Sequence, residues 1–251
     1  MRVRQCGYSG GMNQRIETAV GLAPQRPDRN AVADWTLAQL HEMVFNGQLA
    51  AGDVLTEMDL TERLGVSRSP VRDALKELEH SGLVNVDPVN GRRILRAFGP
   101  DDIAESYDIR VELEAIAARY AARVANESAL QHLTESYDAM VGALLEPLDV
   151  WLPIDFAFHA AVAAASGAHR LPHMLAGVWL QHQAFLRRMD RGGVDPSTRD
   201  QRLETLRTHE RILTAIRAGD ETGSDEAVRL FLGDRRDSIL GKFREMGFGT
   251  V

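Results

Sequence analysis

Two histidines and an aspartate in the second half of the chain have the types and spacing of metal ligands. Asp155 and His159 are four residues apart, and the Ala-rich sequence after them favours a helix. Residues four apart share one face of a helix about one turn apart, as two ligands of one cation must. His209, in the middle of another helical segment, is the third candidate. The alternative is structural: an Asp–His hydrogen bond across one turn, and a lone histidine on a helix.

Arginines and serines in the first half have the types and spacing of a DNA contact. Arg68 and Arg72 are four residues apart and share one helix face. A planar guanidinium group binds a guanine edge or a phosphate through two donors at once. Ser67 and Ser69 place short donors at the start of the same helix, where backbone N–H groups already attract anions. The alternative is that both arginines are solvated residues that pair with surface carboxylates.

The elements around these arginines follow a helix-turn-helix order with a hairpin behind it. Helical apolar spacing predicts three helices, over residues 30–47, 56–65 and 67–82. Thr56 is a cap for the second helix, and Ser67 to Pro70 begin the third. A hairpin follows over residues 83–95. Asn90-Gly91 is the hairpin signal. Arg92, Arg93 and Arg96 lie on or beside this hairpin, where a wing tracks the adjacent DNA backbone or minor groove. The pattern predicts a winged helix-turn-helix.

The net charge of −7 argues against a nucleic-acid partner only until it is divided along the chain. Residues 1–99 carry 12 basic and 12 acidic side chains, whereas residues 100–251 carry 17 and 24. Within residues 63–96, seven basic side chains face four acidic ones. This local excess is what contact with phosphates requires.

Composition excludes several other classes of protein. The chain has 251 residues, 44% of them hydrophobic and 26% charged, which is typical of a soluble globular protein. Cys6 is the only cysteine, so neither a disulfide framework nor a thiolate metal cluster is expected. No apolar run approaches the ~18 residues that span a membrane, so we expect a cytoplasmic protein without a membrane partner. Residues 1–30 lack periodicity and are expected to form a flexible arm.

After Phe98-Gly99-Pro100 the sequence becomes Ala-rich and helical, with almost no strand signal. Breaks at glycine and proline positions divide it into six helical segments, over residues 101–125, 127–145, 150–166, 169–190, 198–218 and 224–246. Residues 100–251 are therefore predicted to form an all-helical antiparallel bundle, large enough to enclose a cavity. The fold class is mainly α, with a winged helix-turn-helix over residues 31–99.

Residues 64–79, Leu-Gly-Val-Ser-Arg-Ser-Pro-Val-Arg-Asp-Ala-Leu-Lys-Glu-Leu-Glu, resemble the helix-turn-helix of GntR-family bacterial transcription regulators. Residues 47–52 are similar to the family's G-x-L-x-x-G turn, with Ala51 where proline is usual, and Gly91 matches its wing. The resemblance implies base contacts by Arg68 and Arg72 and backbone contacts by Arg63, Ser67 and Ser69. Met58 stands where the fatty-acid-responsive branch has an arginine, so that contact is not expected here.

Residues 101–240 resemble the helical effector domain of the FadR subfamily, called the FCD domain. The matching positions are Arg110 with Glu114, Asp155-x-x-Phe158-His159, Ser166-Gly167, His209-Glu210 and Gly219-Asp220. In that family an Asp and three His hold a divalent metal below the effector pocket. The resemblance thus implies Asp155, His159 and His209 as ligands. The fourth ligand is missing, because gap-free counting places Phe231 at its position.

Two alternatives remain open in this region. Asp234, three residues after Phe231, is a possible fourth ligand if the last helix is shifted by a local insertion. Otherwise three ligands and water bind zinc, nickel or manganese with reduced affinity. Arg110 either binds an effector carboxylate or pairs with Glu114 one helical turn away.

The sequence indicates a metabolite-responsive transcription regulator rather than an enzyme. A single short recognition helix contacts few base pairs, so a homodimer on a palindromic operator is expected. We expect a repressor that a small organic acid releases from double-stranded operator DNA. The alternatives are a metal-sensing regulator and an enzyme with a two-histidine, one-carboxylate metal site.

Overall fold

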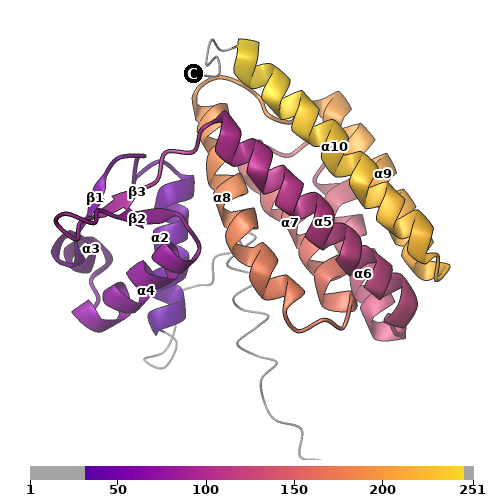
Figure 1. Cartoon of the computed structure of the whole chain (residues 1–251), viewed down its shortest axis with the longest axis horizontal. Helices are drawn as coiled ribbons and strands as arrows, with labels where there is room; N and C mark the ends of the chain where they lie inside the picture. The colour runs from indigo at the N-terminus through magenta and orange to yellow at the C-terminus, as the bar shows by residue number, and fades with distance from the viewer. Residues whose placement is uncertain (1–31, 246–251) are drawn as a thin grey trace, which may run out of the picture.

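The computed structural model describes residues 32–245, which form two helical units joined by an extended segment (Figure 1). The expected arm, residues 1–30, and Cys6 lie outside the described residues. The N-terminal head, residues 32–99, holds α2 (Val32–Phe45), β1 (Val54–Leu55), α3 (Glu57–Leu64), α4 (Arg68–His80), β2 (Val84–Val86) and β3 (Arg93–Leu95). The helical domain holds α5 (Pro100–Val124), α6 (Glu127–Gly142), α7 (Leu148–Ala165), α8 (Leu171–Arg191), α9 (Arg199–Arg217) and α10 (Glu221–Glu245).

The head is a winged helix-turn-helix, as the sequence predicts. β2 and β3 pair antiparallel, with Val84 opposite Leu95, which confirms the hairpin. The sheet also contains β1, which pairs antiparallel with β3 and gives the order β1-β3-β2. This third strand is missing from the sequence prediction, because two residues are too short to carry an alternating pattern.

The helix ends of α3 and α4 fix the turn between them. The Thr56 hydroxyl accepts a hydrogen bond from the Asp59 backbone N–H at 3.2 Å, which confirms the predicted cap of α3. Gly65 ends α3 with a φ of 64°, a left-handed conformation that favours glycine. Ser67 occupies the N-cap position of α4, but its side chain makes no capping hydrogen bond. The Ser67 hydroxyl therefore remains available at the start of α4.

The helical domain contains the six predicted helices, with every end within three residues of its predicted position. Long α5 packs against α7, α8, α9 and α10, and so forms the centre of the bundle (Figure 1). Among the described helices, α7 is long and apolar enough to cross a membrane, so the expectation that no apolar run approaches that length is wrong. However, 67% of α7 is buried inside the bundle, as in the core helix of a soluble protein.

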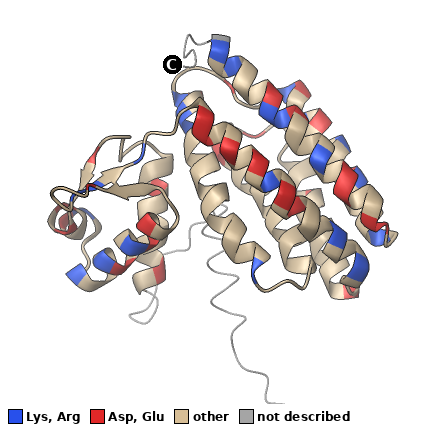
Figure 2. Ribbon diagram, in the orientation of Figure 1, with Lys and Arg blue, Asp and Glu red and all other residues tan. Residues whose placement is uncertain are grey.

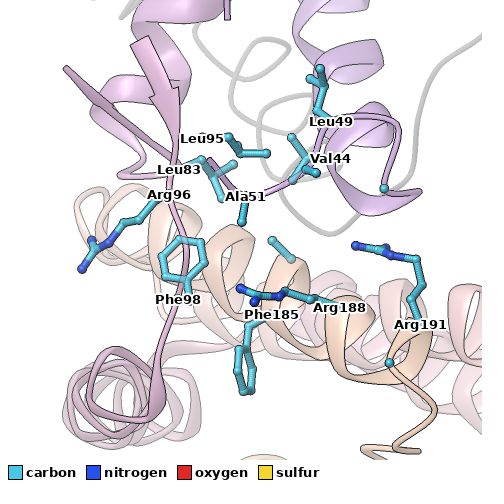
Figure 3. A pocket seen from close by; sticks show the side chains of 14 residues that line it. Val44, Leu49, Ala51, Leu83, Leu95, Arg96, Phe98, Phe185, Arg188 and Arg191 are labelled. Atoms are coloured by element: carbon cyan, nitrogen blue, oxygen red, sulfur yellow. The ribbon is translucent and has the colours of Figure 1, made fainter. Parts of the chain in front are cut away.

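The head contacts the helical domain through α8. Gln181 donates a hydrogen bond to the Ser81 carbonyl at 2.6 Å, at the end of α4. Arg191 donates to the Phe45 carbonyl at the end of α2, and the Arg187 guanidinium lies 4.9 Å from the Phe45 ring centroid. Beside these contacts lies an interdomain cleft of about 350 Å³ with walls from Leu95, Phe98 and Phe185 (Figure 3).

Candidate DNA-binding surface and effector site

The N-terminal end of α4 presents a polar, basic surface. Ser67, Arg68 and Ser69 are exposed there, and basic positions alternate with acidic ones along the rest of α4 (Figure 2). Arg92 is exposed on the turn between β2 and β3. The predicted DNA-contacting residues of α4 and the wing therefore lie on the surface of the head.

Arg72 is held by a carboxylate from the preceding helix. Its Nε and Nη2 donate to Glu57 Oε1 and Oε2 at 3.0 and 3.1 Å. The Arg72 side chain remains 54% exposed and that of Glu57 27%. The hydrogen bond from Arg72 lowers the pKa of Glu57, which keeps this carboxylate ionised. The sequence left Arg72 either to contact DNA or to pair with a surface carboxylate. The structure shows the pair with Glu57, and Arg72 still lies on an exposed face of α4.

Other arginines of the head have internal partners. Arg63 donates to the Gln48 carbonyl at 3.3 Å and lies 3.6 Å from Asp59, so it ties the end of α3 to the loop before β1. Arg93 pairs with Glu79, and Arg96 pairs with Asp102 at the start of α5. Arg92 has no ion pair within residues 32–245, which leaves it the freest cation of the wing.

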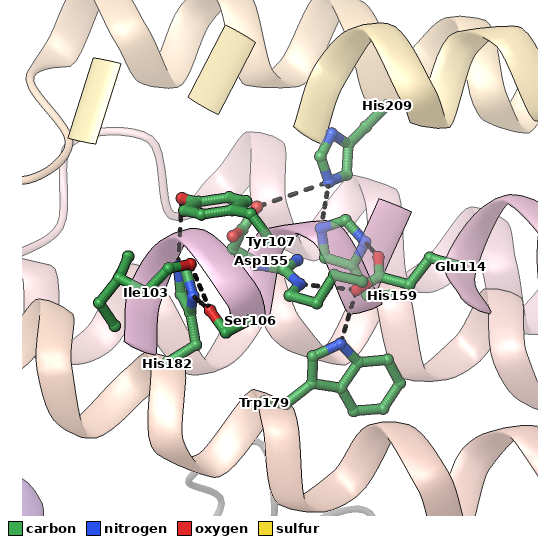
Figure 4. A network of polar contacts seen from close by, with 10 residues as sticks. Ile103, Ser106, Tyr107, Glu114, Asp155, His159, Trp179, His182 and His209 are labelled. Atoms are coloured by element: carbon green, nitrogen blue, oxygen red, sulfur yellow. Dashed lines mark hydrogen bonds and ion pairs between the residues drawn. The ribbon is translucent and has the colours of Figure 1, made fainter. Parts of the chain in front are cut away.

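The three predicted metal ligands converge from two helices. Asp155, His159 and His209 each offer one ligand atom, and these three atoms all lie within 4.8 Å of one another. His209 Nε2 lies 3.3 Å from His159 Nε2 and 3.5 Å from Asp155 Oδ1 (Figure 4). Both histidines are buried, and Asp155 Oδ1 is buried without a hydrogen bond in the described part of the chain.

The outer nitrogens of both histidines face acceptors, which fixes where their protons lie. His209 Nδ1 lies 2.8 Å from the Thr205 carbonyl, which only accepts, so Nδ1 carries the hydrogen. His159 Nδ1 lies 2.7 Å from Glu114 Oε2, and this contact also requires a proton on the nitrogen. Burial lowers the pKa of His209 well below its ordinary value and keeps the ring neutral. The Nε2 lone pair of His209 therefore faces His159 Nε2 at 3.3 Å, an arrangement that a cation between the two rings, or a proton on His159 Nε2, stabilises.

This cluster fits a divalent ion. Two ligand atoms that each lie 2.0–2.1 Å from a tetrahedral metal ion are about 3.3–3.4 Å from one another. The distances from His209 Nε2 to His159 Nε2, 3.3 Å, and to Asp155 Oδ1, 3.5 Å, are close to this value. A carboxylate or carbonyl behind each imidazole is also the usual second layer of such sites. The fourth direction is apolar, because Phe231 stacks on His159 at 5.5 Å and meets His209 edge-on at 4.6 Å between ring centroids.

The ring contacts of Phe231 agree with gap-free placement of the last helix. Asp234 is exposed on α10 and lies outside the cluster, so the structure does not bring this possible fourth ligand to the site. Residues three apart lie about 60° apart around a helix, on neighbouring faces, and here Phe231 is buried while Asp234 is exposed.

Glu114 is the centre of a buried polar network that sequence reasoning treated only as a partner of Arg110. Its Oε1 accepts from Arg110 Nε at 2.7 Å and from Trp179 Nε1 at 2.8 Å, and its Oε2 faces His159 (Figure 4). Burial raises the pKa of Glu114, but the Arg110 guanidinium and His159 outweigh it, so the pKa lies well below its ordinary value. Glu114 is therefore ionised and joins α5, α7 and α8.

A small cavity of about 20 Å³ lies beside the cluster. It is lined in part by Tyr107, Arg110, Asp155, His182, Phe231 and Arg235. His182 contacts the Tyr107 hydroxyl and Ser106 Oγ, each at 3.1 Å. The volume of the cavity is close to that of one water molecule, so a larger ligand must displace side chains. Tyr107, His182 and Arg235 are missing from the sequence prediction, because mid-helix positions carry no local sign that they line a cavity.

Comparison with known proteins agrees with both domains. Residues 34–94 match the family of bacterial regulatory proteins called the gntR family, and residues 105–234 match the FCD domain. The chain is 31% identical to the HTH-type transcriptional regulator YdhC of Bacillus subtilis over 195 residues, which cover 76% of this chain and 83% of that protein. It is 28% identical to the HTH-type transcriptional regulator LutR of the same organism over 222 residues, which cover 81% of this chain and 99% of LutR.

A solved structure has the same fold. McbR/YncC of E. coli superimposes with a TM-score of 0.71 at 21% identity, over 85% of this chain and 98% of that one. Together the two domain matches and the relatives confirm the family resemblance. The chain therefore belongs to the GntR family of bacterial transcription regulators and carries an FCD domain behind its DNA-binding head.

Proposed function

We propose that the protein is a cytoplasmic, homodimeric repressor that leaves a palindromic operator when a small organic acid binds its FCD domain. One observation carries this proposal: the same chain has a GntR-type head, in which Arg68 and Arg72 are exposed on α4, and an attached FCD domain with a cavity lined by charged side chains. Repression needs only occupancy of the operator, whereas activation needs a further contact surface. An enzymatic role has no support in the family.

Charge supports an acidic effector. Arg110 and Arg235 both line the cavity, and Arg235 Nη1 is buried without a hydrogen bond among the described residues. A buried donor without an acceptor is costly, and a carboxylate would supply the acceptor. Arg110 keeps further N–H donors while its Nε binds Glu114. The small cavity volume favours a compact acid.

Helix α8 supports a route from the cavity to the head. His182 lines the cavity, while its neighbour Gln181 holds the Ser81 carbonyl at the end of α4. Arg191, the last residue of α8, donates a hydrogen bond to the Phe45 carbonyl. A ligand that displaces His182 therefore shifts the helix on which the head rests, and so changes the distance between the two heads of a dimer.

We also propose that Asp155, His159 and His209 hold a divalent ion such as zinc, nickel or manganese. The bound ion supplies positive charge and open positions for an effector carboxylate. The facing Nε2 atoms support this ligand set, while Phe231 leaves it one protein ligand short. A metal-sensing role, with the ion itself as the effector, has less support because three ligands give lower affinity.

Added zinc is expected to raise the melting temperature of metal-free protein. At a free zinc concentration 100 times the Kd, binding stabilises by about 2.7 kcal/mol, or about 5–10 °C for a chain of this size. His209→Ala is expected to lose this increase, and Phe231→His to enlarge it by completing the ligand set. Thermal unfolding followed by circular dichroism, with and without zinc, measures both.

The matched control for this prediction is His132→Ala, which removes an exposed histidine of α6 and is expected to keep the full zinc shift. Asp234→Ala is also expected to keep it. If zinc raised the melting temperature of His209→Ala as much as that of the parent protein, the proposed ligand set would be wrong.

A fragment of residues 100–251 is expected to remain a dimer. We assign the interface to the helical domain because the head must be free to reposition on DNA. Light scattering on the fragment and on the full chain at micromolar concentration gives both masses. A dimeric full chain with a monomeric fragment would show that the heads hold the dimer together.

The function as a whole is tested by sequencing the DNA that the purified protein retains from fragmented genomic DNA. A palindromic consensus is expected. Small mono-, di- and hydroxycarboxylic acids are then screened for release of that DNA. Retention without sequence preference would contradict the proposal, and release by neutral sugars alone would contradict the acidic effector.

A further inference from the structure

The ion pair between Arg72 and Glu57 uses one particular edge of the guanidinium group. The donors are Nε and Nη2, at 3.0 and 3.1 Å from the two carboxylate oxygens. An arginine carries five N–H donors in a fixed plane, so three remain. One of these lies on Nη2 and two on Nη1. The end of the guanidinium, between Nη1 and Nη2, therefore still offers two parallel N–H groups.

Two parallel N–H groups are what a guanine edge accepts. Guanine presents O6 and N7 side by side in the major groove, and arginine binds them through two donors. Because Glu57 occupies the other edge, base contact does not require the ion pair to break. The Arg72 side chain is 54% exposed, so this contact is also sterically open.

The contact between the Glu57 carboxylate and Arg72 depends on the packing of two helices, because the two residues lie on α3 and α4. Glu57 is the first residue of α3, directly after the Thr56 cap, while Arg72 lies 15 residues later on α4. Acidic residues are stabilised in the first turn of a helix. Arg68, on the same face of α4 as Arg72, has no such partner among residues 32–245.

Ionised Glu57 has two effects on DNA recognition. It holds a long, flexible side chain in one orientation, which lowers the entropy lost when Arg72 binds a base. It also places a negative charge near the phosphates, which weakens binding to DNA of any sequence. Both effects raise the ratio of specific to random binding.

We propose that Glu57 is a positioning residue that fixes Arg72 for bidentate recognition of one guanine in each half-site. This inference deepens the proposed function and rests on it, because it assumes that α4 reads operator bases. It assigns a role in specificity to a carboxylate that does not itself touch a base.

The test compares the full-length parent protein with Glu57→Gln, Arg72→Ala and the double variant. Duplexes with a randomised central region are selected on the parent protein and sequenced. Binding is then measured for the selected duplex and for duplexes with one base pair changed at a time. Glu62→Gln is the matched control, since Glu62 is an exposed glutamate of the same helix with no ion pair in the described structure.

Arg72→Ala is expected to lose the preference for one guanine in each half-site. Glu57→Gln is expected to weaken the same preference about 2- to 10-fold, the scale of ordering one long side chain, while its affinity for random duplex rises. In the Arg72→Ala background, Glu57→Gln should have no further effect at that base pair. Glu62→Gln should leave every base preference unchanged.

Other outcomes overturn the inference in distinguishable ways. A Glu57→Gln variant that loses affinity equally at all positions, with a lower melting temperature, would mean that the ion pair only joins α3 to α4. An unchanged preference in Glu57→Gln, beside a lost one in Arg72→Ala, would reject the positioning role and leave the proposed function intact. A parent protein that selects no consensus would reject both.

Discussion

Replacing Arg72 with alanine is expected to abolish the preference of the protein for its operator over random DNA. Removing one bidentate hydrogen-bonded pair with a base costs about 1–3 kcal/mol, and a dimer has two such pairs, so the expected cost is about 2–6 kcal/mol. The reason is the position of Arg72 on the exposed face of α4, with one edge of its guanidinium free. Competition between operator and random duplex in a fluorescence anisotropy titration measures the ratio.

Arg92→Ala is the matched comparison, because it removes another exposed arginine of the head. If Arg92 binds a phosphate, the variant should bind both duplexes more weakly, and the slope of its salt dependence should fall by about one for each phosphate no longer neutralised. If Arg72→Ala keeps the parent's ratio of operator to random affinity, α4 does not read bases through this residue.

Replacing Glu114 with alanine is expected to destabilise the helical domain by about 3–5 kcal/mol. This is the usual loss when one partner of a buried ion pair is removed and the other charge stays buried. Arg110 is only 3% exposed and would lose its carboxylate, while Trp179 Nε1 and His159 Nδ1 would lose an acceptor. The melting temperature should fall by roughly 6–20 °C in thermal unfolding.

Glu112→Ala is the control for this prediction. Glu112 lies two residues away on α5 and also binds an arginine, Arg229, but its side chain is 65% exposed. An exposed pair contributes about 0–1 kcal/mol, so the change should be small. The double variant Arg110→Met/Glu114→Leu should recover part of the loss, since it removes both buried charges. A loss below about 1 kcal/mol for Glu114→Ala would mean that water reaches Arg110.

Local patterns were sufficient for the helical architecture of this protein. The ends of α3 to α10 follow from caps, glycines and prolines that act within a few residues, such as Thr56 and Gly65. The ligand trio also follows from sequence, because Asp155 and His159 lie one turn apart on α7 and the family resemblance adds His209. Strand β1 was missed because its pairing with β3 joins residues about 40 positions apart.

Only the tertiary structure decided how the charged side chains pair. The sequence left Arg110 and Arg72 each with two readings, since an arginine reaches partners on its own helix, on another helix or in a ligand. Packing of α5 against α7 and α8 places Arg110 in a buried network with Glu114, Trp179 and His159, so its pair with Glu114 is present and its effector contact stays a prediction.

The packing of α3 on α4 places Glu57 beside Arg72, so this ion pair is present too, and the base contact of Arg72 stays a prediction. The same holds for the cavity, whose lining residues Tyr107, His182 and Arg235 come from three helices. Secondary structure is encoded by interactions between near neighbours in the chain, whereas ion pairs and cavities depend on distances between helices that near neighbours do not fix.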